Sequence, residues 1–422
     1  MTGSEPRSRA GDKGTLEVDF DHHSPAFAEG AEALLAEIRH RCPVAWTSRY
    51  GGYWLVTTSA GAHLVMRDDL VFSSGRNSYG GDGLGKAIPK FDPGILMIPG
   101  ELDGPVHRPY MKLIAQLLSP SRAEALQPVA RKWATHFLDQ VIETGACDLM
   151  YDYAVPVPGA VALEWLGFPP NDWRPMAQTL HDFAGYAADT PQFASALAAF
   201  PRIFSRCQEQ VEDRIRHPQE DATTEIATSQ VAGIPMSEQD AVSIVFTLVL
   251  AGLDTTSSLV GSALVHLHRH TEDRRRLIED PDLLDLATEE FLRLYPPATN
   301  SARTVMADTD VCGVQLHKGD RVLVSWVSAN HDEDTFSDAN RFVLDRFPNP
   351  HHSFGLGPHR CLGSHLARVV FKEMLTQALA RIPDYVIADE QVVAYPSRAI
   401  ATGWTTAPAT FTPGSRLTTA KT

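Results

Sequence analysis

Apolar residues recur along most of the chain with the period of an α-helix. They lie three and four positions apart, which places them on one face of a helix. Ser237 and Asp240 form a helix-start signal ahead of the longest such segment. The helices that this pattern predicts cover residues 31–40, 105–118, 120–144, 156–166, 172–188, 192–217, 237–270, 281–295 and 362–382.

A smaller part of the chain predicts strands and loops. Residues 53–57 are typical of a strand, and residues 311–316 and 320–324 predict two short strands joined at Lys318-Gly319. Further short strands are expected after the last helix. Residues 73–100 are rich in Gly and Pro and predict a long irregular loop, and loops of this length are often functional.

The chain contains no internal repeat and no low-complexity linker. We therefore predict one domain over residues 1–422, mainly α with a small β portion. Residues 1–14 and 412–422 are small, polar or charged, and we expect them to form loose termini.

Composition and charge exclude one class of partner. Of the 422 residues, 43% are apolar and 21% are charged, as in a globular protein. The net charge of −15 argues against a nucleic-acid-binding protein, which needs a basic surface to neutralise phosphates. The same charge gives no general attraction to anionic membranes.

No segment predicts a membrane span or a disulfide framework. The longest apolar run, 241–253, is interrupted by Thr247 and is shorter than the roughly 20 residues that a bilayer requires. The N-terminus lacks the apolar core of a signal peptide. The five cysteines are widely spaced and odd in number, and we expect four of them to be small buried hydrophobes. We expect a cytoplasmic monomer.

The segment 354–363, Phe-Gly-Leu-Gly-Pro-His-Arg-Cys-Leu-Gly, places Cys361 in a glycine-rich loop just before a helix. A thiolate at a helix N-terminus is stabilised by the helix dipole and by free amides. The glycines let the backbone approach a flat ligand closely. A lone cysteine is more often structural, but this pattern as a whole favours a ligand. A zinc site is disfavoured, since the spacing of His351, His352, His359 and His365 matches no usual zinc motif.

The segment 251–256, Ala-Gly-Leu-Asp-Thr-Thr, lies in the middle of the long apolar helix. Gly252 costs the helix about 1 kcal/mol relative to alanine, so a compensating role is expected. Taken alone, Thr255 most simply bonds back to a helix carbonyl, and Asp254 most simply pairs with a surface base. A buried proton relay is the functional alternative.

Three motifs together resemble those of the cytochrome P-450 family. Phe-x-x-Gly-x-x-x-Cys-x-Gly at 354–363 resembles its haem-binding signature, Glu290-Phe-Leu-Arg293 its Glu-x-x-Arg helix, and 251–256 its oxygen-activation motif. The resemblance covers about residues 18–411. It implies a triangular helical prism with a long central helix over a haem b. It also implies a monooxygenase that uses dioxygen and two electrons to hydroxylate or O-dealkylate a small apolar molecule, such as a terpenoid or an aromatic.

The resemblance assigns a role to each matching residue. Cys361 would be the axial ligand of the haem iron, and Asp254 and Thr255 would deliver protons. Glu290 and Arg293, which lie three residues apart on one helix, would form a structural triad with Arg346. The remaining cofactor contacts would come from His107, Arg303, His359, Ala251, Gly252, Phe354, Gly355, Leu362 and Gly363.

The sequence also departs from the family pattern. Many relatives have an arginine four residues after the position of His107, where this chain has Met111, so Lys112 or Arg108 is expected to replace that propionate contact. The chain most resembles the camphor-hydroxylase-like group, yet the place of the camphor-orienting tyrosine falls on Ile95. The predicted substrate pocket is mostly small or apolar and comprises Ile95, Met97, Thr247, Leu250, Ala298, Thr299, Ala399 and Ile400.

Electrons must come from a partner, because no nucleotide fingerprint of the Gly-x-Gly-x-x-Gly type follows a strand. The resemblance implies NAD(P)H, a reductase and a small ferredoxin with a two-iron, two-sulfur cluster. The expected docking surface is the basic set Arg108, Lys112, Arg360, Arg368 and Lys372. A peroxygenase is disfavoured because the acid–alcohol pair is intact. A non-catalytic haem sensor or carrier, and a haem-free helical binding protein, remain alternatives.

Overall fold

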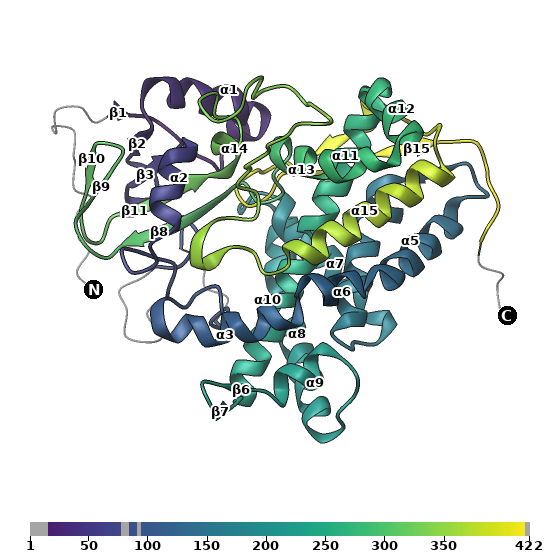
Figure 1. Ribbon diagram of the computed structural model, residues 1–422, viewed down its shortest axis with the longest axis horizontal. Coiled ribbons are helices and arrows are strands. Elements are labelled where there is room, and N and C mark those ends of the chain that lie inside the picture. Colours follow the sequence, from purple (N-terminus) through teal and green to yellow (C-terminus); the bar gives the residue numbers. More distant parts are fainter. Residues whose placement is uncertain (1–15, 77–83, 91–93, 418–422) are drawn as a thin grey trace. The chain divides into compact units, whose positions relative to one another are not determined.

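The computed structural model describes residues 16–76, 84–90 and 94–417, and the chain divides into two compact units (Figure 1). The prediction of a single domain stays a prediction. Each unit is assembled from separate stretches of the chain. Unit 1 comprises Met1–Tyr110, Ala298–Arg341 and Pro350–Cys361, and unit 2 comprises Met111–Pro297, Phe342–Asn349 and Leu362–Thr422.

Unit 1 is built on a six-stranded mixed sheet with the strand order β1-β2-β3-β11-β8-β4. β2 and β3 form an antiparallel hairpin, β11 runs parallel to β3, and β8 and β4 continue antiparallel. The strands are β1 (Leu16–Glu17), β2 (Val44–Thr47), β3 (Tyr53–Val56), β4 (Phe72–Ser73), β8 (Asn300–Val305) and β11 (Arg321–Ser325).

Helices cover both faces of this sheet, because successive strand residues point to opposite sides. Trp54 and Val56 of β3 pack in one apolar cluster with Val65 of α2. Tyr53 and Leu55 of the same strand belong to a second cluster that includes apolar side chains of α1. The helices of this unit are α1 (Pro25–Arg41), α2 (Ser59–Met66) and α14 (Trp326–Ala329), and α3 (Gly104–Leu117) begins in it.

The prediction of one strand over residues 311–316 is wrong, because the chain turns within this segment. β9 (Thr309–Val311) and β10 (Val314–Leu316) pair with each other, and β11 belongs to the main sheet. Cys312 and Gly313 have φ of 54° and 82°, so the chain reverses between them. Two successive residues of positive φ are typical of a tight hairpin turn. The first of them is Cys312, and cysteine is not a residue type from which a turn is predicted.

Unit 2 is helical, with α10 (Glu238–Leu253) packed against α8 (Pro191–Arg216) and α6 (Pro156–Trp165), and α15 (Ser364–Arg381) packed on α5 (Gln127–Val141). Its other helices are α4 (Pro120–Glu124), α7 (Trp173–Gly185), α9 (Ala222–Ala227), α11 (Thr255–Arg269), α12 (Thr271–Glu279) and α13 (Leu284–Leu294). Its short strands are β5 (Ala146–Asp148), β6 (Gln230–Val231), β7 (Ile234–Pro235), β12 (Val386–Ile387), β13 (Val393–Ala394), β14 (Trp404–Thr406) and β15 (Pro408–Thr410). The expected class, mainly α with a small β portion, is confirmed.

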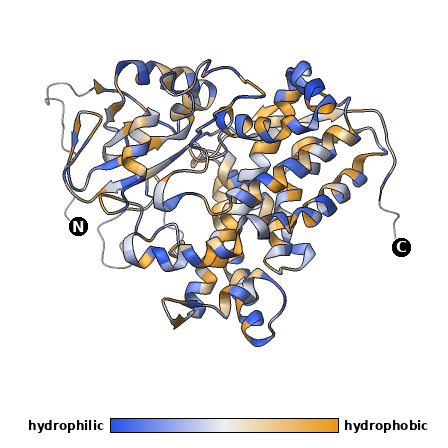
Figure 2. Cartoon of the chain, viewed as in Figure 1, coloured by the Kyte–Doolittle hydropathy of each residue, from blue (hydrophilic) through white to orange (hydrophobic). Residues whose placement is uncertain are grey.

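The long apolar helix begins where the sequence predicts and breaks once. The Ser237 side chain accepts from the Asp240 amide at the start of α10. Asp254, with φ of −110°, separates α10 from α11. By length and composition the segment Glu238–Arg269 could cross a membrane. The apolar run 241–253 is therefore part of a longer apolar helix, and its shortness does not exclude a membrane span. However, 67% of the most apolar 18-residue window of this segment is buried inside the protein. That burial, together with the hydrophobic colouring of α10 in Figure 2, is typical of a core helix.

Glu290 is a buried hub in unit 2. Its carboxylate accepts from Arg293 through Nε and Nη2, both at 2.8 Å, and from Arg346 Nε at 2.9 Å. Asn349 Nδ2 and the Val343 amide donate to the same carboxylate at 3.0 and 2.9 Å. Glu290 and Arg293 are 0% exposed, so the pair is not the surface pair that i, i+3 spacing usually indicates. The three side chains meet as the resemblance implies.

Hydrogen bonds hold the C-terminal tail to the rest of unit 2 over residues 412–417, the last residues that the structure describes. The Gly414 amide donates to the Ile142 carbonyl at 2.9 Å, and the Leu417 amide donates to Asp139 at 3.1 Å. The expectation of a loose tail is therefore wrong for residues 412–417. Residues 418–422 and 1–15, which include the expected N-terminal leader 1–14, lie outside the described residues.

We predict that Ser237→Ala lowers the free energy of unfolding by about 1 kcal/mol, because it removes the hydroxyl that caps α10. The measurement is urea unfolding followed by circular dichroism. Ser205→Ala is the control, since Ser205 is exposed inside α8, where alanine is a better helix former. An equal effect of the two substitutions would contradict the capping role.

We predict that Glu290→Gln destabilises the protein by about 3–5 kcal/mol, because two buried guanidinium groups lose their anion. Thermal and urea unfolding measure the loss. Glu272→Gln removes an exposed carboxylate paired with Arg275, and should leave stability unchanged. A small effect of Glu290→Gln would show that the hub carries little stability.

Candidate functional site

The cysteine loop lies at the end of unit 1, and α15 begins at Ser364, three residues after Cys361. The Cys361 amide donates to the Phe354 carbonyl at 2.7 Å, and the Gly355 amide donates to the His352 carbonyl at 2.8 Å. These bonds close the loop on itself. Cys361 is exposed, and none of the five cysteines forms a disulfide. Of the other four only Cys207 is fully buried, so the expectation of four buried cysteines is wrong for Cys42, Cys147 and Cys312.

Two glycines give the loop its path. Gly355 and Gly357 both have φ of 65°, a left-handed conformation that side-chain-bearing residues rarely adopt. A Cβ on Gly357 would lie 2.2 Å from the Met66 carbonyl oxygen, so only glycine fits there. The backbone conformation of the loop therefore requires glycine at these two positions, whether or not the glycines also contact a ligand.

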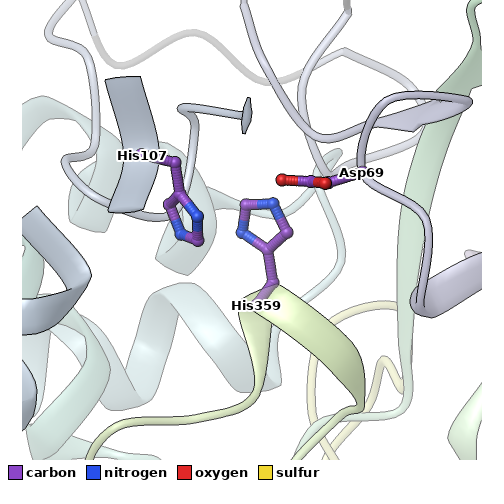
Figure 3. Close-up of side chains that lie close together, drawn as sticks. All are labelled: Asp69, His107 and His359. Carbon is purple, nitrogen blue, oxygen red and sulfur yellow. The ribbon is translucent and has the colours of Figure 1, made fainter. Parts of the chain in front are cut away.

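His107 and His359 face each other in unit 1, His107 from α3 and His359 from the loop that leads to Cys361 (Figure 3). Their ring centroids are 4.2 Å apart. Both ring nitrogens of His107, and Nδ1 of His359, are buried without a hydrogen-bond partner. Burial and the neighbouring His359 lower the pKa of His107 to about 4. Buried polar atoms rarely lack a hydrogen-bond partner, so we expect these two side chains to bind a ligand.

The second nitrogen of His359 is held by Asp103. His359 Nε2 lies 3.0 Å from Asp103 Oδ1 and 3.2 Å from the Ser74 hydroxyl. Burial by itself would raise the pKa of Asp103, but hydrogen bonds from His359, Ser73 and the Ser74 amide lower it well below its usual value. The sequence reasoning missed this carboxylate, which fixes the orientation of His359.

Arg303 adds a buried positive charge beside the histidines. It lies in β8, 2% exposed, and donates to the Ser301 hydroxyl and the Ala302 carbonyl. No carboxylate pairs with it in the described part of the chain, and desolvation lowers its pKa to about 10. Lys86 is half-buried, and desolvation also lowers its pKa, with opposing contributions from Glu101 and Cys361. Lys86 was not predicted, because it comes from the irregular loop.

These charges decide what the site binds. Asp69, His107 and His359 offer ligand atoms within 4.8 Å of one another, a geometry that could hold a metal ion (Figure 3). Burial lowers the pKa of His359, the hydrogen bond and the charge of Asp103 oppose this, and the charges of Arg303 and Lys86 lower it further. Asp69 and Asp103 contribute negative charge at this place, but neither forms an ion pair with Arg303, and an anion would satisfy Arg303 and the unpartnered N–H of His107. The cluster therefore favours an anionic ligand.

The acid–alcohol pair lies in unit 2. The Thr255 hydroxyl donates to the Ala251 carbonyl at 3.0 Å, the back-bonding expected of a helical threonine, and Thr255 is exposed. Asp254 is 5% exposed and does not pair with a surface base. It lies 3.0 Å from His181 Nδ1 and accepts from the Tyr395 hydroxyl at 3.0 Å. Neither partner was predicted, since each is remote in sequence.

The other predicted residues are distributed over both units. Phe354, Gly355, Leu362 and Gly363 are half-buried in and after the cysteine loop, while Ala251 is exposed and Gly252 half-buried on α10. The pocket residues of unit 1 are Ile95, Met97, Ala298 and Thr299, and those of unit 2 are Thr247, Leu250, Ala399 and Ile400. Thr299 is 1% and Ala399 7% exposed, whereas Ile400 is 41% exposed.

Comparison with known proteins places these motifs in a family. The family described as cytochrome P-450 matches residues 197–382. Linalool 8-monooxygenase of Pseudomonas putida is 30% identical over 364 residues, which cover 82% of this chain and 88% of that protein. The chain belongs to the cytochrome P-450 family. A steroid C26-monooxygenase of Mycolicibacterium smegmatis is 31% identical and aligns over 75% of this chain and 79% of that protein.

Solved cytochrome P-450 structures share the fold over nearly the whole length. A cytochrome P-450 of Chondromyces apiculatus is 27% identical, with a TM-score of 0.82, and covers 95% of this chain and 99% of its own. A cytochrome P-450 of Mycobacterium marinum in complex with pseudoionone has a TM-score of 0.85 at 24% identity, with 94% of this chain and 99% of that chain covered. The named relatives are monooxygenases, and the family implies haem and dioxygen.

The residues present fit a haem. The unpartnered N–H of His107 and the buried guanidinium of Arg303 match the two carboxylates of the porphyrin side chains. The exposed thiol of Cys361, in a loop that only glycine allows, matches an axial thiolate ligand.

We predict that Gly357→Ala prevents normal haem incorporation, because a Cβ there collides with the Met66 backbone. The readout is the ratio of Soret to protein absorbance in the purified protein. Gly313→Ala is the matched control, since Gly313 has φ of 82° but open space around its Cα. That variant should keep its haem and lose only about 1–2 kcal/mol of stability. Equal haem content in the two variants would contradict the steric argument.

Proposed function

We propose that this cytochrome P-450 binds haem b through the Cys361 thiolate and hydroxylates a small apolar molecule. Two observations carry the proposal. Cys361 is exposed in a glycine-built loop, and the buried Arg303 and His107 of the same unit have no carboxylate partner among the described residues. A haem held through a cysteine thiolate supplies the chemistry of dioxygen cleavage, with one oxygen atom going to the substrate.

His107, His359 and Arg303 hold the propionates in this proposal. The neutral ring of His107 donates through its one N–H, while Arg303 supplies the fixed charge. His359 Nε2 donates to Asp103, so its bare Nδ1 has a hydrogen for a propionate only in the protonated ring. Lys86 takes the place of the arginine missing at Met111, because its charge acts on Arg303, His107 and His359. Arg108 and Lys112, the candidates from the sequence, are both exposed.

Asp254 and Thr255 handle protons in this proposal. Asp254 is buried and hydrogen-bonded, so it is held in place between proton transfers. Thr255 presents a hydroxyl whose hydrogen bond to Ala251 leaves the oxygen able to accept. The structural triad around Glu290 fixes the segment that precedes the cysteine loop and touches neither substrate nor protons.

The substrate class follows from the relatives and from the pocket residues. The relatives named after linalool and a steroid act on isoprenoid compounds, and the pocket positions of this chain are mostly small or apolar. A monoterpenoid or a similar apolar molecule is the substrate class we propose. Ile95 offers no hydroxyl to orient a ketone, so oxidation of camphor itself is not proposed.

Electrons would come from NAD(P)H through a reductase and a ferredoxin in the cytoplasm. The proposed docking surface is smaller than the sequence predicts, since Arg368 pairs with Glu289 and Lys372 with Asp285. The exposed cations Arg108, Lys112 and Arg360 have no ion pair among the described residues. They are the residues we propose for ferredoxin binding.

A non-catalytic haem sensor or carrier is the alternative on the same fold. Turnover of a terpenoid with NADH, a reductase and a ferredoxin separates the two functions. Product formation supports the monooxygenase, whereas ligand binding without oxygen incorporation supports the sensor.

We predict that the dithionite-reduced protein, on addition of carbon monoxide, shows the strongly red-shifted Soret band of a thiolate-ligated haem. Cys361→His should replace that band with the one of an imidazole-ligated haem, because the axial ligand has changed. Cys207→Ala is the control, since Cys207 is buried in α8 and belongs to unit 2, whereas the cysteine loop belongs to unit 1. Protein without a haem band, from cells supplied with haem precursor, would overturn the proposal.

A further inference from the structure

Asp254 is held by a buried histidine and a buried tyrosine, a contact set that the family motif does not contain. His181 lies on α7, and Tyr395 directly follows β13. His181 Nδ1 and the Tyr395 hydroxyl are each 3.0 Å from Asp254 Oδ1 and 2.9 Å from each other. The exposed fractions are 4% for His181 and 2% for Tyr395. In the described ranges no lysine or arginine pairs with Asp254.

The hydrogen positions follow from these distances. An ionised carboxylate only accepts hydrogen bonds, and a phenol has a single hydrogen to donate. Tyr395 gives its hydrogen to Asp254 Oδ1, so His181 must carry a hydrogen on Nδ1 to approach both oxygens favourably. This leaves Nε2 as the second proton-binding atom of His181. Nε2 is buried and has no hydrogen-bond partner in the protein as described.

Tyr395 is fixed in place and stays neutral. A Cβ on Gly185 would lie 2.7 Å from its Cδ1, and a Cβ on Gly403 would lie 2.7 Å from its Cε2, so the ring fills a slot between two glycines. Burial, reinforced by the charge of Asp254, raises the pKa of Tyr395 well above its usual value. Tyr395 therefore orients the carboxylate without titrating.

His181 is the group in this cluster with two ring nitrogens, so it can take a proton at Nε2 and release one at Nδ1. The other titratable groups around it are Asp254, Tyr395 and Asp182. Asp182 is its neighbour on α7 and accepts from Gln178 at 2.9 Å. Ser258 contributes a neutral hydroxyl 3.4 Å from Asp254 Oδ2.

We infer that His181 is a positioning residue that passes protons to Asp254, and that Tyr395 aligns the pair. The inference rests on the proposed role of Asp254. In the step, a hydronium ion that reaches Nε2 gives it a proton and leaves as water, while Nδ1 releases its own proton to Asp254 Oδ1. One O–H bond of hydronium and the Nδ1–H bond break, the Nε2–H bond and an O–H bond on Asp254 form, and no electron moves. The ring returns to its first tautomer when Nε2 releases its proton to water and Nδ1 takes one from hydronium.

The kinetic test uses the haem-loaded protein with photoreduced deazaflavin as electron donor, so that neither ferredoxin nor substrate is needed. Under these conditions dioxygen takes two electrons and two protons and leaves as hydrogen peroxide. We expect His181→Phe and His181→Gln each to slow oxygen consumption by at least about tenfold and to increase the solvent deuterium isotope effect. The control His136→Gln changes an exposed histidine of α5 and should behave as the wild type.

The variants separate the inference from the function on which it rests. His181→Gln keeps a hydrogen-bond donor but cannot relay a proton, so wild-type rates in this variant would overturn the relay. Asp254→Asn tests the acid itself, and a normal rate there would overturn the proposed role of Asp254. Slow Asp254→Asn together with normal His181→Phe would overturn the inference alone.

A second readout does not depend on turnover. Histidine side-chain NMR of the diamagnetic ferrous carbon monoxide complex gives the pKa of His181, with the signal assigned by its loss in His181→Gln. We expect Asp254→Asn to lower that pKa, because the imidazolium loses an adjacent anion. An unchanged pKa would show that the two side chains are not coupled.

Discussion

One buried carboxylate determines much of this structure. Glu290 neutralises Arg293 and Arg346 and also accepts from Asn349 and the Val343 amide. A buried anion with several donors is stable only while all of them are present, and removal of one partner leaves a buried charge. Because Asn349 directly precedes Pro350, the same interaction anchors the chain where the cysteine-containing stretch of unit 1 begins. A short helix motif thus holds the segment that leads into the cysteine loop, although the two are remote in sequence.

A cluster of basic side chains in unit 1 has the opposite electrostatic balance. Arg303, His107 and Lys86 are buried or half-buried, and their pKa values are lowered by desolvation. Such a cluster is unfavourable in the protein alone and becomes favourable when a dianion binds. The buried hub around Glu290 therefore belongs to the stability of the fold, whereas the cationic cluster belongs to the binding of its proposed cofactor.

The surroundings of Asp254 come from outside the family motif to which this residue belongs. The motif supplies the acid and the alcohol, but α7 and the segment after β13 supply the groups that hold the acid. Those groups are an imidazole and a phenol, and no lysine or arginine of the described residues pairs with the acid. The proton relay that we propose accordingly depends on an imidazole from another helix.

Local chemistry allowed much to be predicted from the sequence alone. The period of apolar residues predicts the helices, and the ten-residue cysteine pattern with its fixed glycines predicts the loop and its ligand, because both depend on neighbours in the chain. The turn at Cys312-Gly313 was missed, since its left-handed conformation has no marker in the residue type of Cys312. Only the tertiary structure decided three contacts: the partners of Asp254, the hydrogen bond of His359 to Asp103, and the place of Lys86 near Arg303. Each of these contacts joins residues from separate elements. A single sequence shows the periodicity of its elements, but it does not show which residues of distant elements pack together.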